Sequence, residues 1–156
     1  MCYFTHIALS KMVDPPPHTE LLRVSYVAPT PGPGPQELDR TWFTNQHIYY
    51  LGSKSGCSCT FRYWQHEIGM VPPQDWAHED PGDPALLATR ELFRWLRHLH
   101  EDGIDIELVV KWATEPLPRN EFIAINLDDI TEETFLMFDD YKIKFPTNYV
   151  FTSPLR

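Results

Sequence analysis

The sequence predicts an α+β fold, in which a mixed or mainly antiparallel sheet packs against one long amphipathic helix. Short stretches rich in β-branched and aromatic residues recur along the chain, and one segment carries helix-end signals at both of its ends. No internal repeat and no linker divides the sequence. A chain of 156 residues can bury roughly two-thirds of its unfolded surface. We therefore expect a single domain that spans residues 1–156.

The helix is marked by its two ends. Asp83 is placed to accept hydrogen bonds from the first turn, Pro84 stands at the first helical position, and Gly103 follows the last turn. Apolar residues between these ends recur at spacings of three and four, which is the pattern of one helix face. They are Ala85, Ala88, Leu92, Trp95, Leu96 and Leu99. The basic residues expected on the solvated face are Arg90, Arg94 and Arg97.

Strands are expected on both sides of this helix. They span Cys2–Leu9, Thr41–Leu51, Thr60–Gln65, Ile106–Ala113, Glu121–Leu127, Thr134–Phe138, Tyr141–Phe145 and Asn148–Thr152. The second and third of these flank the Gly52–Cys59 loop and predict a long-looped hairpin. The fourth and fifth are joined by a proline-containing loop and are expected to be neighbours in the sheet. The segment Thr19–Val27 fits neither a helix nor a strand period, and prolines mark Pro29–Pro35 and Val71–Pro84 as connections.

Charge and hydropathy exclude several function classes. Thirteen basic and twenty-two acidic side chains give a formal charge of −9 at pH 7, which repels phosphate backbones and argues against a nucleic-acid partner. No apolar run approaches the roughly 20 residues that a membrane helix needs. The N-terminus lacks the basic and apolar regions of a secretory signal. We expect a cytoplasmic protein whose partner is a small molecule or a basic protein.

The cysteines form the one unusual constellation. Cys57 and Cys59 lie one residue apart after Gly56, and Cys2 lies at the start of the first expected strand. Thiolates are soft ligands for zinc, and a tetrahedral zinc site needs four donors. The glycine allows the backbone to turn so that both thiols of the loop bind one ion. If the first strand lies beside the loop, Cys2 supplies a third ligand.

The fourth ligand is limited by distance. His6 lies four strand residues from Cys2, or roughly 13 Å, and His47 lies about as far from the loop. His78, an acid from Val71–Pro84, or water is then the fourth donor. An open position filled by water is how catalytic zinc is built, which would allow a Lewis-acid role on an unknown substrate. The sequence thus predicts a zinc site at Cys2, Cys57, Cys59 and His78.

Two alternatives remain open. In the first, the cysteines are core side chains of a non-enzymatic acidic binding module of the immunity or inhibitor type, whose acids between Asp128 and Asp140 neutralise a basic partner. In the second, removal of Met1 makes Cys2 an N-terminal nucleophile with its own amine as base. This Met-Cys start resembles class II glutamine amidotransferases and SRAP-type abasic-site proteins. Both families continue with glycine, where this chain has Tyr3.

A further resemblance joins the three cysteines. Cys2, the segment Tyr49–Gly52 and the segment Gly56–Cys59 resemble a group of uncharacterised small bacterial proteins with a Met-Cys start and a Cys-x-Cys loop after an aromatic strand. The pattern in that group reads His-Cys-x-Cys-Gly, whereas this chain has Gly56 in place of the histidine and Thr60 in place of the glycine. The resemblance implies no activity. It makes the three cysteines a set to be tested together.

Overall fold

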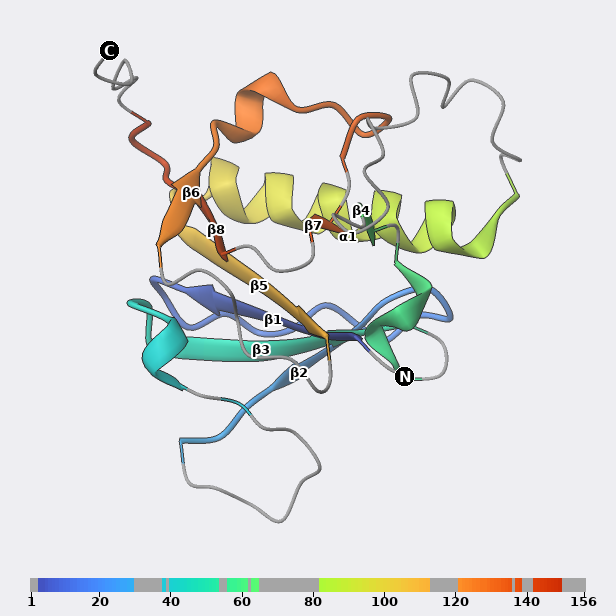
Figure 1. The fold of residues 1–156 in the computed structure, drawn as a ribbon, viewed down its shortest axis with the longest axis horizontal. Coiled ribbons are helices and arrows are strands. Elements are labelled where there is room, and N and C mark those ends of the chain that lie inside the picture. The colour runs from blue at the N-terminus through green and yellow to red at the C-terminus, as the bar shows by residue number, and fades with distance from the viewer. Residues whose placement is uncertain are drawn as a thin grey trace.

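The computed structural model describes residues 3–29, 38, 40–53, 56–61, 63–64, 82–112, 121–135, 137–138 and 142–149. In this part of the chain, six strands form one sheet in the order β2-β3-β1-β5-β8-β6, and the helix α1 lies across one face of it (Figure 1). Its strand pairs are antiparallel except for β6 and β8, which run parallel. The predicted α+β class is therefore confirmed, with a mixed and mainly antiparallel sheet.

The elements have the following bounds. The strands of the large sheet are β1 (Tyr3–Leu9), β2 (Arg23–Tyr26), β3 (His47–Gly52), β5 (Ile106–Trp112), β6 (Phe122–Ala124) and β8 (Lys142–Phe145). A separate two-stranded parallel sheet consists of β4 (Tyr63–Trp64) and β7 (Met137–Phe138). The helix is α1 (Pro84–Glu101), and short 3-10 turns are η1 (Arg40–Trp42), η2 (Ser58–Thr60) and η5 (Leu127–Asp129).

Strand β1 lies in the middle of the large sheet and is buried on both faces. Ile7 and Leu9 belong to the main core, which also contains the apolar side of α1. Ala8 points to the opposite face and packs in a second cluster with Phe43 and Ile48. This alternation follows the two-residue period of a strand. It explains why the successive residues Ile7, Ala8 and Leu9 are all apolar, rather than every second one.

Helix α1 begins and ends where the sequence predicts. The Asp83 carboxylate accepts hydrogen bonds from the backbone N–H groups of Ala85, at 2.7 Å, and Leu86, at 3.2 Å. Gly103 follows the helix with φ +71°, a conformation that glycine adopts without strain. The buried side chains of the helix are Leu86, Ala88, Thr89, Leu92, Phe93, Leu96 and Leu99. Ala85 and Trp95 are only half-buried, so the buried stripe is rotated slightly from the predicted one.

The predicted hairpin around the cysteine loop is wrong. Strand β3 pairs with β1 and β2, whereas β4 pairs with β7 in the small sheet. The chain turns sharply after β3, since Ser53 N–H donates to the Cys57 carbonyl at 3.0 Å and Gly56 N–H donates to the Ser53 carbonyl at 2.7 Å. The turn leads into η2 instead of a returning strand. The loop thereby ends against the sheet rather than at the tip of a hairpin.

The predicted pairing of the two strands that follow the helix, Ile106–Ala113 and Glu121–Leu127, is also wrong. Strand β8 lies between β5 and β6, and β5 has β1 and β8 as its neighbours. Burial explains this order, because Ile143 and Phe145 of β8 are core residues, whereas Ile123 of β6 is 41% exposed. The more apolar strand takes the inner position. The strand predicted at Asn148–Thr152 is absent at the two residues described, 148 and 149, and the rest of it lies outside the described residues.

The basic face of α1 binds part of the acidic segment that follows β6. Arg94 forms two hydrogen bonds with the Glu132 carboxylate, and Arg97 bonds Asp128 at 2.7 Å. These contacts tie η5 and the residues after it to the helix. The arginines are thus not simply solvated, and two of the acids have partners within the chain. In the described part of the chain, no helix combines the length and the apolar character needed to cross a membrane.

Candidate functional site

Cys57 and Cys59 lie at η2, which packs against the N-terminal end of β1 (Figure 1). Neither residue forms a disulfide bond; Cys57 is half-buried and Cys59 is exposed. The Cys59 sulfur accepts a hydrogen bond from the backbone N–H of Tyr3 at 3.3 Å, and the Cys57 sulfur accepts one from the N–H of Cys59 at 3.3 Å. Amide donors of this kind orient and tune sulfur ligands in metal sites.

The loop that carries the thiols requires glycine at two places. Gly56 has φ +74°, which a residue with a side chain adopts only at a cost. A Cβ atom at Gly52 would lie 2.8 Å from the carbonyl oxygen of Gly56, closer than real contacts allow. The two glycines therefore let the chain fold back tightly just before Cys57. The sequence signal for this turn was the glycine itself.

Ser58 fixes the residue between the two cysteines to the large sheet. Its side chain is fully buried. The hydroxyl donates to the Leu51 carbonyl at 2.6 Å and accepts from the Thr5 N–H at 3.1 Å. Thr5 and Leu51 are register partners in the β1–β3 ladder. The hydroxyl thus stands between two paired strands and holds η2 on both of them.

Tyr50 contacts the same loop from β3. Its hydroxyl donates to the Gly56 carbonyl at 3.1 Å and lies 3.2 Å from the Ser58 hydroxyl. Burial raises the pKa of Tyr50 above its ordinary value, and the nearby cysteines add to this effect. The ring packs edge-on against His6, with ring centroids 5.5 Å apart. Tyr50 therefore stays a neutral phenol at the base of the thiol loop at ordinary pH.

The predicted zinc ligands are only partly described. Cys57 and Cys59 lie together at η2, whereas Cys2 and His78 lie outside the described residues. Among the residues that the structure describes, no group of three or more His, Cys, Asp and Glu side chains could hold a metal ion. His47 is the register partner of Leu9, at the opposite end of β1 from Tyr3. The structure thus keeps that histidine away from the thiols, as the sequence predicts.

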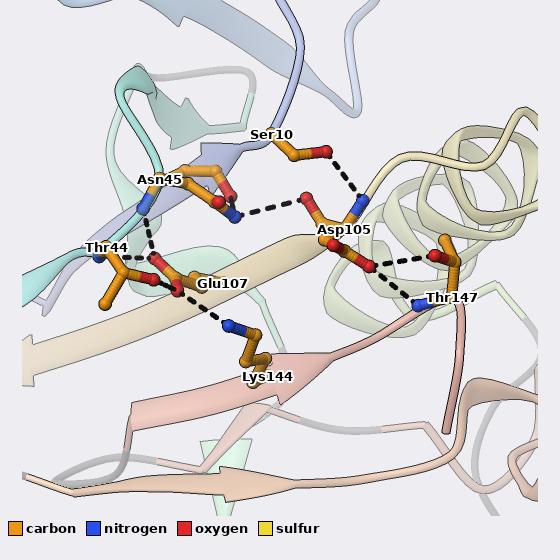
Figure 2. A network of polar contacts seen from close by, with 8 residues as sticks. Ser10, Thr44, Asn45, Asp105, Glu107, Lys144 and Thr147 are labelled. Carbon is orange, nitrogen blue, oxygen red and sulfur yellow. Dashed lines mark hydrogen bonds and ion pairs between the residues drawn. The ribbon is translucent and has the colours of Figure 1, made fainter. Parts of the chain in front are cut away.

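A second polar cluster lies at the other end of β1, around Glu107 of β5 (Figure 2). The Glu107 side chain has no exposed surface. One carboxylate oxygen accepts from the N–H groups of Thr44, at 2.9 Å, and Asn45, at 3.0 Å. The other accepts from the Thr44 hydroxyl and pairs with the Lys144 amine at 3.4 Å. A buried carboxylate is tolerated when its oxygens are bonded in this way.

Asp105 extends the same network (Figure 2). Its carboxylate accepts from the N–H of Thr147 at 2.8 Å and from the Thr147 hydroxyl at 3.0 Å. Its backbone carbonyl accepts from the Asn45 amide at 3.3 Å, and its N–H donates to the Ser10 hydroxyl at 3.0 Å. The two carboxylates therefore join the loop before β3 and the residues after β8 to β5. They hold the fold together.

Sequence reasoning missed several of these residues. Glu107 was visible as a lone acid inside the apolar run IELVV. An acid in such a run indicates a buried carboxylate, which needs hydrogen-bond donors or a cation around it. Lys111 and Lys142 are also buried, with their amines 5.3 Å and 5.4 Å from the centres of the Trp42 and Phe122 rings. Ser58 and Tyr50 carried no signal, because their contacts depend on how the loop folds back onto β3 and β1.

Comparisons with known proteins do not identify the chain. No protein-family model matches it, and no curated protein and no solved structure matches it either.

Proposed function

We propose that this chain is a small zinc-binding domain in which Cys2, Cys57 and Cys59 are thiolate ligands. The observation that carries the proposal is the hydrogen bond from the Tyr3 amide to the Cys59 sulfur, at 3.3 Å. That amide belongs to the peptide bond between Cys2 and Tyr3. Cys2 is therefore linked covalently to the residue whose amide contacts the Cys59 thiol.

The surroundings of the thiols support zinc rather than a hard cation. Sulfur ligands select soft or borderline metals, and zinc is the common one for cysteine sites. Each described thiol already has an amide donor, a contact that supports a bound thiolate. Cys59 is exposed, which leaves the site accessible to solvent. His78, an acid of Val71–Pro84, or water completes the proposed coordination.

An open fourth position would give the metal a Lewis-acid role on a small molecule whose identity the site does not specify. A reducing cytoplasm is the compartment in which such thiols persist, and we propose that location. The acidic binding module is the main alternative. It is weakened by the bonds of Arg94 to Glu132 and of Arg97 to Asp128, which use two of its acids within the chain.

Elemental analysis tests the proposal. The full chain would be purified without a His-tag and without chelators, beside Cys57→Ser/Cys59→Ser and Cys2→Ser variants. We expect about one equivalent of zinc in the wild-type protein, none in the double variant and a reduced content in Cys2→Ser. Folded wild-type protein that stays metal-free after zinc is offered would overturn the proposal and leave the binding module as the next hypothesis.

The fourth ligand is tested by cobalt substitution. Co²⁺ bound by thiolates gives visible bands that depend on the ligand set. A His78→Ala variant should change those bands if the imidazole is a ligand. His98→Ala is the matched control, since His98 lies on α1 with its side chain 72% exposed. Identical spectra for all three proteins would exclude His78 and leave an acid or water.

A further inference from the structure

Metal binding by Cys57 and Cys59 does not itself require a polar residue between them. A Cys-x-Cys pair binds a metal through its sulfurs, whatever side chain lies between. In this chain that residue is Ser58, and it is fully buried with its hydroxyl 2.6 Å from the Leu51 carbonyl and 3.1 Å from the Thr5 amide. A buried hydroxyl bonded to two strands restricts the backbone on both sides of it.

Tyr50 restricts the loop from the other side. Its hydroxyl reaches the carbonyl of Gly56, the residue just before Cys57, at 3.1 Å, and lies 3.2 Å from the Ser58 hydroxyl. The backbone is thus held at Gly56, just before Cys57, and at Ser58, between Cys57 and Cys59. The two hydroxyls fix the segment from which both sulfurs extend.

We propose that Ser58 and Tyr50 are positioning residues for the thiol pair, and that their hydroxyl groups set its metal affinity by holding the loop in its ligating conformation. This inference rests on the proposed zinc function. Groups that orient metal ligands without touching the metal typically change affinity by about 10- to 100-fold when removed. Neither hydroxyl is proposed to contact the metal.

The test compares Ser58→Ala and Tyr50→Phe with the wild-type chain. Zinc affinity would be measured by competition with a chromophoric chelator, and ligand geometry by the visible spectrum of the Co²⁺ form. Ser10→Ala is the matched control, because the Ser10 hydroxyl also accepts a backbone N–H, that of Asp105, but at the far end of β1. We expect an affinity loss of about tenfold or more in the two loop variants and none in the control.

A second readout separates positioning from a merely structural role. Zinc should slow hydrogen exchange at the amides of Tyr3 and Thr5 in the wild-type protein, because these amides are bonded to Cys59 and Ser58. Ser58→Ala should retain its zinc stoichiometry but lose the zinc-dependent protection at Tyr3, whose acceptor, the Cys59 sulfur, the substitution leaves in place. A structural role alone would change exchange equally with and without zinc.

The outcomes are distinguishable. Wild-type affinity in both loop variants, with zinc bound by the wild-type chain, would overturn the positioning role and leave the zinc function standing. Absence of metal from the wild-type chain would overturn the zinc function and this inference with it. Where Ser58→Ala fails to fold, Tyr50→Phe decides, since it removes a half-buried hydroxyl and keeps the ring.

Discussion

Each end of β1 lies beside a polar side chain that accepts backbone N–H bonds, but the side chain at one end is buried and the residue at the other is exposed. Near Leu9, the Glu107 carboxylate has no exposed surface and accepts two backbone N–H bonds together with a hydroxyl and a lysine amine. Near Tyr3, the sulfur of Cys59 also accepts a backbone N–H, but Cys59 is an exposed residue. The buried acceptor with four bonds holds the fold, whereas the exposed residue at the other end is one of the proposed metal ligands.

The largest effect is expected at the buried end. Glu107→Gln keeps the shape of the side chain but replaces an accepting oxygen with a donor. The amide oxygen can keep the N–H bonds of Thr44 and Asn45, but the NH2 group then faces the Lys144 amine, so that the buried ion pair is lost. We expect this to lower the free energy of unfolding by about 3 kcal/mol. Urea denaturation measures it, with Glu101→Gln as the control because that side chain is 64% exposed. Equal midpoints for the two variants would contradict a holding role for Glu107.

The next effect belongs to the thiol end and depends on metal. Zinc at a free concentration one hundred times its Kd should raise the free energy of unfolding of the wild-type chain by about 2.7 kcal/mol. The Cys57→Ser/Cys59→Ser variant should gain nothing. Urea denaturation with and without zinc measures the difference. A zinc effect of equal size in both proteins would mean that the stabilisation arises elsewhere.

A smaller effect is expected from the loop backbone. Gly56→Ala and Gly103→Ala both introduce a side chain at positive φ, +74° and +71°, without a steric contact within 4 Å. Each should cost about 1 kcal/mol of folding free energy. Only Gly56→Ala should also weaken zinc binding, because Gly103 follows α1. Unchanged zinc affinity in both variants would show that the turn does not position the thiols.

The smallest effect is expected at alkaline pH, through the neighbours Tyr49 and Tyr50 of β3. Burial raises the pKa of each phenol above its ordinary value near 10. The folded state thus favours the neutral phenol, so this stability is fully present below pH 10 and is lost as the pH rises through the raised pKa. Urea midpoints above pH 10, followed with tyrosinate absorbance, measure the decline.

Tyr49→Phe is the control for that decline. The Tyr49 hydroxyl donates to the Val13 carbonyl at 2.8 Å and accepts the Val13 N–H at 3.0 Å. The variant loses these bonds at every pH but should show a shallower fall in stability above pH 10. A slope identical to that of the wild-type chain would assign the alkaline loss to other groups.

The elements that depend on local signals could be predicted from the sequence. The Asp83 carboxylate, Pro84 and Gly103 act within one turn of the helix ends, so their roles are readable without tertiary structure. Strand pairing was not readable. Two strands that are adjacent in sequence were expected to pair, but the order of β5, β8 and β6 is set by how much apolar surface each strand buries. That quantity depends on the whole sheet.

The candidate site was likewise only partly predictable from the sequence. Residue type and spacing identify Cys57 and Cys59, and the structure places them together at η2. The contact of Ser58 with Thr5 was hidden because it depends on β1 lying beside β3. The contacts of Tyr50 were hidden because they depend on how the loop folds back onto β3. The predictions for Cys2 and His78 concern residues outside those described, and metal analysis has to test them.

The position of β1 has a consequence for biosynthesis. It leaves the ribosome before both of its neighbours, which are β3, beginning at His47, and β5, beginning at Ile106. One edge of this apolar strand stays open until most of the chain has been made. Nascent chains with open apolar edges associate readily, and long-range pairing folds slowly. The yield of folded protein should therefore depend on chaperones that protect β1 during translation.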